Sequence, residues 1–189
     1  MTPFEALKRV TDFTKEHIAP LLLMRKEPLA RNNDITKMPV DNTGDFAEER
    51  GHPTVTYGTM PHKNFVPYDF CVPLILWTFD EVDDDFETSD GTRKVKLRAY
   101  VAAYSSEMYE DEKTKLPDNK AFLDLINALE KIYQELSRRH IINGVGREKQ
   151  ITYGVYDGLF YPYAYGWLTL TAELPRMEYE ENIDLDIIL

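Results

Sequence analysis

A dense run of carboxylates is the first place in this sequence where residue types and spacing could support chemistry. Seven acidic residues and no basic one lie between positions 80 and 90: Asp80, Glu81, Asp83, Asp84, Asp85, Glu87 and Asp90. Converging carboxylates are the ligands that calcium and magnesium prefer. An EF-hand loop counted from Asp85 fails, because Asp90 then stands where the motif requires glycine. We expect a solvated acidic hairpin, with no metal site and no cofactor.

No nucleophile with a neighbouring base can be recognised in the sequence. The histidines are scattered and form no His-x-x-x-His pair: His17, His52, His62 and His140. The single cysteine, Cys71, begins an apolar run, where a free cysteine usually behaves as a small core hydrophobe. The glycine patterns that cradle nucleotide phosphates are absent as well. We expect no catalytic residue and a protein that is not an enzyme; a metal-dependent hydrolase using residues 83–85 is the weakest alternative.

The charge of the chain is concentrated in two segments. The 189 residues carry 22 Lys plus Arg and 33 Asp plus Glu, a formal net charge of −11. Twelve of the acids and none of the bases lie in residues 80–90 and 178–189, so the rest of the chain has a net charge of about +1. Phosphate-backbone binding needs clustered Lys and Arg, so we expect no specific nucleic-acid binding. No apolar run is long enough for a membrane span, and we see no secretory signal.

The elements that must position these residues follow from periodicity and punctuation. Thr2, Pro3 and Glu5 predict a capped helix that ends near Ala19, before Pro20. Apolar runs and alternation predict strands at 71–79, 93–104, 149–156 and 165–174, the first two joined as an antiparallel hairpin. Apolar spacing of three and four predicts a long helix from about 118 to 136. Residues 28–70 show no sustained period and predict a long loop or arm.

This order of elements predicts the fold class. We expect an α+β fold in which a mostly antiparallel sheet of about four strands is packed by the N-terminal helix and the long central helix. The prediction is a single domain over 1–178, with 28–70 as an insertion, followed by an acidic C-terminal tail at 179–189. In that tail Ile183, Leu185, Ile187, Ile188 and Leu189 are apolar between acids, which suits a segment that docks on a neighbouring copy; a disordered end is the alternative.

Three groups of residues predict contacts with other protein chains. Lys94, Lys96 and Arg98 share one face of the 93–104 strand and could meet acids of a neighbouring copy, such as Asp83, Asp84 and Asp85. The run from 159 to 167 is rich in aromatic residues, which are favoured at interfaces. Its candidate interface residues are Phe160, Tyr161, Tyr163 and Tyr165. An ordinary solvent face and a loop folded over the core are the alternative interpretations.

The closing segment carries a family resemblance. Residues 161–166, Tyr-Pro-Tyr-Ala-Tyr-Gly, lead into a strand that ends in Leu174-Pro175 and then into the acidic tail. This arrangement resembles a family of small neck and tail-completion proteins of tailed phages and prophages, which are similar in fold to tail terminators. The strand ending in acids at 74–85, the strand at 94–104 and the central helix follow in the same order as in that family. The resemblance covers about residues 70–180 and the first helix.

The resemblance implies a structural virion protein. Such proteins form a closed ring, often six-fold, that caps the tail tube and faces the head connector, so the implied partners are other copies of the chain, the tail tube protein and the connector protein. The implied location is the virion neck, and the host cytoplasm during assembly. A head–tail connector or stopper is the nearest alternative. An acidic immunity or inhibitor protein that binds a basic partner is the alternative of a different class.

Overall fold

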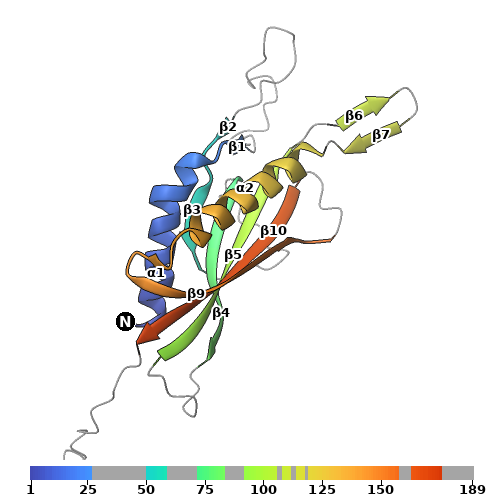
Figure 1. Cartoon of the computed structure of the whole chain (residues 1–189). Helices are drawn as coiled ribbons and strands as arrows, with labels where there is room; N and C mark the ends of the chain where they lie inside the picture. The colour runs from blue at the N-terminus through green and yellow to red at the C-terminus, as the bar shows by residue number, and fades with distance from the viewer. Residues whose placement is uncertain are drawn as a thin grey trace, which may run out of the picture.

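The computed structural model describes residues 1–26, 50–58, 72–83, 92–105, 108–111, 114–117, 119–157 and 163–175. Within these ranges a twisted sheet lies behind two helices, one at the N-terminus and one at residues 120–137 (Figure 1). More described residues lie in strands than in helices. In the described ranges no helix is both long enough and apolar enough to cross a membrane.

The N-terminal helix α1 (Pro3–Phe13) begins as the sequence predicts. The Thr2 side chain accepts a hydrogen bond from the Glu5 backbone N–H at 3.2 Å, and the Glu5 carboxylate accepts one from the Thr2 backbone N–H at 2.8 Å, which completes a capping box. The helix continues through a π-helical turn, η1 (Thr14–Ile18), and ends in a 3-10 turn, η2 (Ala19–Leu21). The predicted helix end near Ala19 is therefore confirmed.

The main sheet has six strands in the order β3-β4-β5-β10-β9-β8. Their bounds are β3 (Thr54–Tyr57), β4 (Leu74–Asp83), β5 (Thr92–Tyr104), β8 (Ile141–Ile142), β9 (Val145–Val155) and β10 (Tyr163–Pro175). All neighbours are antiparallel except β3 and β4, which are parallel. Two short antiparallel pairs accompany it: β1 (Met24–Arg25) with β2 (Arg50–Gly51), and β6 (Met108–Asp111) with β7 (Thr114–Pro117).

The predicted fold class was wrong. The chain forms a curled, mixed six-stranded sheet with further two-stranded pairs, instead of a mostly antiparallel sheet of about four strands built around a long central helix. One cause lies in the segment expected to be a loop, because Thr54–Tyr57 forms β3 and pairs with β4 in parallel. Such a pairing connects distant parts of the chain, and a four-residue strand leaves no clear alternation in the sequence.

A second cause lies at 141–146, which is outside the four strands that the sequence predicts. Asn143 and Gly144 have φ of 48° and 80°, the left-handed conformation that a tight hairpin turn requires. This turn joins β8 to β9, with Ile142 opposite Val145. It adds the sixth strand to the sheet.

Helix α2 (Lys120–Ser137) lies across β5, β10 and β9 (Figure 1). The carbonyl groups at its C-terminal end accept hydrogen bonds from a side chain of β9, eight to ten residues further along the chain. The buried Arg147 of β9 donates from Nη2 to the Ser137 carbonyl at 2.8 Å and from Nε to the Arg139 carbonyl at 2.6 Å. This contact satisfies groups that the helix end leaves open, and burial lowers the pKa of the Arg147 guanidinium.

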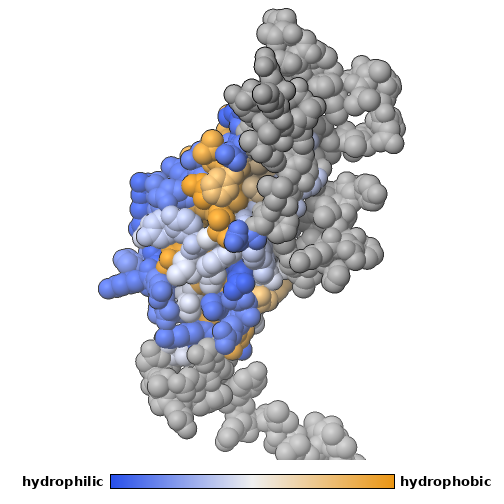
Figure 2. All heavy atoms as spheres, turned by 90° about the vertical axis from the view of Figure 1, so that its right-hand side faces the viewer, coloured by the Kyte–Doolittle hydropathy of each residue, from blue (hydrophilic) through white to orange (hydrophobic). Residues whose placement is uncertain are grey.

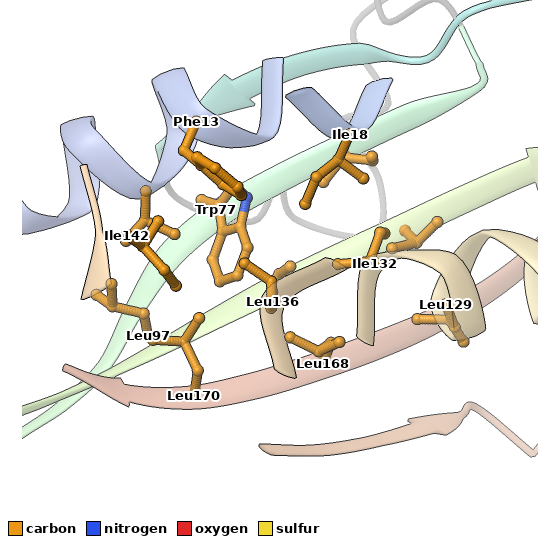
Figure 3. Close-up of a cluster of buried hydrophobic side chains, with 14 of the residues drawn as sticks. Phe13, Ile18, Trp77, Leu97, Leu129, Ile132, Leu136, Ile142, Leu168 and Leu170 are labelled. Carbon is orange, nitrogen blue, oxygen red and sulfur yellow. The ribbon is translucent and has the colours of Figure 1, made fainter. Parts of the chain in front are cut away.

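Both helices bury their apolar stripes against the same face of the sheet. Figure 3 shows Trp77 of β4 at the centre of the cluster, between Phe13 on one side and Leu136 on the other. The fully buried Trp77 indole donates from Nε1 to the hydroxyl of Thr14 at 3.0 Å. That hydroxyl in turn donates to the Val10 carbonyl at 2.8 Å. The polar atom of the largest core side chain is thereby satisfied, as burial requires.

Gly166 lets α2 approach the sheet closely. A Cβ at this position of β10 would lie 2.7 Å from Leu129 Cδ1, 2.9 Å from the Gly154 carbonyl oxygen and 3.2 Å from Leu125 Cδ1. These distances are shorter than side-chain packing permits, so the helix rests on a position that must lack a side chain.

Candidate functional site

The candidate site is the face of the six-stranded sheet opposite the helices, called here the outer face. Along β5, Val95, Leu97 and Ala99 point into the core, so the alternate residues occupy the outer face. In the described part of the chain no helix covers this face. Its aromatic and charged side chains come mainly from β4, β5 and β10: Asp80, Glu81, Lys94, Lys96, Arg98, Tyr100, Tyr104, Tyr163, Tyr165 and Trp167.

The register of β5 and β10 brings together two groups that the sequence analysis had treated separately. Tyr163 lies opposite Tyr104, Trp167 lies opposite Tyr100, and Thr169 lies opposite Arg98. Residues opposite one another in antiparallel strands share a face, so the predicted basic stripe and the predicted Tyr163 and Tyr165 lie on one surface. The adjacency follows from strand pairing across about 70 residues of chain, which no local pattern reveals.

The aromatic half of the outer face is built from close ring contacts. Tyr104 and Tyr163 have ring centroids 5.6 Å apart, and Tyr163 and Tyr165 have centroids 6.1 Å apart with ring planes inclined by 28°. Tyr156, just beyond β9, stacks on Tyr100 at 6.3 Å with an inclination of 14°. Tyrosines are favoured at interfaces because they combine a large apolar area with a polar group. Burial raises the pKa of Tyr156, and the neighbouring Tyr100 adds to this effect.

The charged half is organised around Arg98. Its guanidinium donates from Nη2 to Asp80 Oδ2 at 2.7 Å, and its Cζ lies 5.8 Å from the ring centroid of Trp167. Burial acts to lower the pKa of Arg98, but the hydrogen bond with Tyr100 and the charge of Asp80 together raise it above its ordinary value. Arg98 therefore joins the acids of β4 to the aromatic residues of β10.

The predicted basic stripe has acidic partners within its own chain. Lys96 Nζ lies 3.6 Å from Asp80 Oδ2 and 3.9 Å from Glu81 Oε2, and Lys94 Nζ lies 2.7 Å from Glu148 Oε1. Such half-exposed ion pairs contribute little to stability. They set the pattern of charge that this face presents to a partner.

The acidic run begins inside a strand. Asp80 and Glu81 belong to β4, where a bulge between Phe79 and Glu81 shifts the register. Asp83 is the last residue of β4 and is opposite Lys94. The remaining predicted residues, Asp84, Asp85, Phe160 and Tyr161, lie outside the described residues. The expectation of an acidic hairpin loop starting at residue 80 was wrong for its first part, which is strand.

Two buried polar atoms on the outer face have no hydrogen-bond partner within the described residues. They are Arg98 Nε and Thr169 Oγ1, from the two side chains that lie opposite one another on β5 and β10. Thr169 is 6% exposed.

The described histidines contact separate parts of the chain. His17 packs against the ring of Phe13 at 4.9 Å, and His52 Nδ1 lies 2.8 Å from the Leu22 carbonyl. His140 is exposed after α2, while His62 and Cys71 lie outside the described residues. Among the residues that the structure describes, no group of three or more His, Cys, Asp or Glu side chains is placed to hold a metal ion.

Hydrophobic residues also remain at the surface beside the N-terminal half of α2. Phe122 is 44% exposed and Leu123 is 57% exposed. Seen from the right-hand side of Figure 1, hydrophobic residues gather at the height of this helix, bordered by hydrophilic ones (Figure 2). An exposed apolar patch of this kind is typical of a protein that contacts other chains.

Comparison with known proteins found no matching family model and no matching curated protein.

Proposed function

We propose that this chain is a structural protein of the tailed-phage neck, in which copies form a closed ring that caps the tail tube and faces the head connector. The observation that carries the proposal is the outer face, where the tyrosines of β5 and β10 continue into the Arg98–Asp80 pair. Enriched tyrosine and tryptophan beside arginine is the composition of the contact centre of protein interfaces.

The residues that carry the family resemblance contribute to this surface. The last four residues of the Tyr-Pro-Tyr-Ala-Tyr-Gly motif begin β10, which lies in the sheet between β5 and β9. Alternate residues of β10 have different tasks: Leu168 and Leu170 fill the core, whereas Tyr165 and Trp167 belong to the outer face. β10 therefore has two roles: its core residues pack the sheet against the helices, and its outer residues form the proposed contact surface. These two roles explain why the motif lies at this strand.

The pattern of charge favours a ring over an acidic inhibitor. An inhibitor of a basic partner presents carboxylates whose charge is available to that partner. Here Asp80 accepts from Arg98 at 2.7 Å and lies 3.6 Å from Lys96, so the acids of β4 are offset by the chain's own cations. A mixed pattern of both signs is suited to fixing the register of neighbouring copies.

Charge reversal tests the outer face as the ring contact. Sedimentation velocity would compare the wild type, Lys96→Glu and Lys15→Glu, each alone and with the tail tube protein. Lys96 lies on the outer face, and Lys15 is an exposed residue of η1 on the helical side, so the two variants share the same charge change. We expect the wild type and Lys15→Glu to form a ring. We expect the association constant of Lys96→Glu to be at least tenfold lower. Equal association of both variants would contradict the assignment of the outer face.

A further inference from the structure

The strand β9 lies near one edge of the sheet and has an open side. It pairs with β10 over most of its length, but β8 covers its other side only at Val145 and Gly146, and just before β8 the His140 carbonyl accepts from the Arg147 N–H at 3.1 Å. From Glu148 to Val155 no strand among the described residues pairs with this second side. Figure 1 shows β9 below α2, and in the strand order it lies on the other side of β10 from β5. An uncovered strand edge is a template for pairing with another chain.

The backbone groups that face outward from β9 can be assigned. The Tyr156 N–H donates to the Tyr165 carbonyl at 3.0 Å, so this residue directs its backbone toward β10. Backbone groups alternate in direction along an antiparallel strand. Ile151, Tyr153 and Val155 therefore direct their N–H and carbonyl groups away from β10, toward the open side.

The same three residues offer apolar side chains on the helical side of the sheet. They lie opposite the core residues Leu170, Leu168 and Gly166 of β10. Ile151 packs against the core, while Tyr153 and Val155 remain 38% and 37% exposed. An added strand would cover them and continue the core.

The flank of α2 limits one side of this edge. The Tyr153 hydroxyl donates to Glu130 at 2.6 Å, and its ring lies 5.4 Å from the ring of Tyr133. These contacts hold Tyr153 in place, so the edge is a fixed surface. No carboxylate occurs between residues 149 and 155, and an acidic strand would not be repelled by β9 itself.

We propose that the C-terminal segment 183–189 of a second copy of this chain adds to this edge as an antiparallel strand. The segment has the pattern that the edge requires, because Ile183, Leu185 and Ile187 alternate with Asp184 and Asp186. In an added strand, the apolar residues would cover Tyr153 and Val155, and the acids would point to the outer face. Main-chain hydrogen bonds would supply affinity and the alternation would supply register.

The lengths favour a second copy as the source of the strand. An antiparallel addition must begin near Val155, which is opposite Gly166 of β10. Nine residues of β10 separate Gly166 from its end at Pro175, about 30 Å at strand spacing. The eight residue steps from Pro175 to Ile183 span at most about 29 Å when fully extended, and the path must also cross two strand spacings of about 4.8 Å each to pass β9. The tail of the same copy therefore cannot reach the start of the site.

The exchange joins a tail on one copy to an edge on the next, which makes a head-to-tail contact. Contacts of this kind close into a ring when the rotation between neighbours allows it. The inference thus rests on the proposed ring and names the segment that holds neighbours together.

A labelled peptide of residues 181–189, titrated with the full-length protein and followed by fluorescence anisotropy, tests the strand addition. Two further peptides would carry N-methyl groups either on residues 184 and 186 or on 183, 185 and 187. Only one alternate set of N–H groups faces β9, so we expect one methylated peptide to lose at least tenfold in affinity and the other to bind nearly as the parent does. No binding up to about 1 mM, or equal binding of both methylated peptides, would overturn the proposal.

Two variants at Val155 locate the site. Val155→Pro removes an outward N–H and leaves the β10 ladder intact, a change that an edge strand tolerates. Val155→Thr keeps that N–H and serves as the matched control. We expect only Val155→Pro to abolish peptide binding, with melting temperatures close to that of the wild type in both. Full binding to Val155→Pro would overturn the assignment of the edge.

Ring formation on tail tubes separates the two proposals. If Val155→Pro still forms rings on tail tubes, the strand addition is wrong and the proposed function stands. If the wild type forms no rings, the proposed function is wrong.

Discussion

Replacing Gly166 with alanine tests whether α2 can pack against β10 only when this position has no side chain. The new methyl group would stand 2.7 Å from Leu129 Cδ1 and 2.9 Å from the Gly154 carbonyl oxygen. The leucine can change its rotamer, but the carbonyl belongs to the β9–β10 ladder and can move only if those strands separate. The substitution therefore strains the backbone at the junction of β9, β10 and α2.

The magnitude follows from two opposing terms. Overpacking of a core by one methyl group costs about 1–3 kcal/mol. Removing a glycine from a strand restrains the unfolded chain and returns about 0.5–1 kcal/mol. The net loss lies in the range of about 0–2.5 kcal/mol and is centred near 1 kcal/mol, which lowers the melting temperature of a chain of this length by about 2–4 °C.

Gly58 provides the matched control. A Cβ there would have its nearest neighbour, Leu76 Cδ1, at 4.0 Å, which is ordinary van der Waals contact. Gly58→Ala should leave stability unchanged or raise it by up to about 1 kcal/mol. Urea unfolding followed by tryptophan fluorescence measures both variants. If Gly166→Ala were as stable as Gly58→Ala, the close approach of α2 to β10 would not be a real requirement of the fold.

Two further perturbations concern buried polar groups. Thr14→Val removes the acceptor of the Trp77 indole and should cost about 1–3 kcal/mol in urea unfolding, whereas Thr14→Ser should retain most of the stability; equal losses would contradict the role of the hydroxyl. The hydrogen bond from Arg139, aided by the charges of Lys131 and Arg138, lowers the pKa of Glu135 from its usual 4.5. A lowered folded pKa stabilises the protein above about pH 5, and this contribution is lost as the pH falls through the lowered value. Melting temperatures at pH 3 to 7 should therefore fall less steeply toward acid in Glu135→Gln than in the wild type, and parallel curves would refute this.

The sequence predicted local elements well where one residue pattern determines them. Thr2, Pro3 and Glu5 set the start of α1 through contacts only three residues apart. The alternation of 93–104 produced β5, because one face meets the core and the other does not. Patterns of this kind need no knowledge of the rest of the chain.

The arrangement of the sheet could not be predicted in the same way. β3 is four residues long and gains its place from a parallel partner, β4, across residues that show no period. The Arg147 contact with the end of α2 likewise depends on the β8–β9 turn, which returns the chain to the helix. Interactions of this type depend on the assembled fold and leave no repeat in the sequence.

The candidate interface was predicted in its parts and missed in its arrangement. Lys96, Arg98, Tyr163 and Tyr165 were chosen from charge and aromatic content, and the β5–β10 register places them on one face. Trp167, Tyr100 and Tyr156 were not singled out, because their contacts with Arg98 and with one another arise from strand pairing and from the end of β9. The intrachain partner Asp80 was expected to belong to a loop, yet it belongs to β4.

Negative-stain electron microscopy of the full-length protein mixed with tubes of the tail tube protein from the same phage tests the central claim most directly. We expect a closed ring of several copies on one end of the tube. The ring should also form with Lys15→Glu, and it should be absent when Lys96→Glu replaces the wild type. Tubes with bare ends at saturating concentrations of the wild-type protein would contradict it.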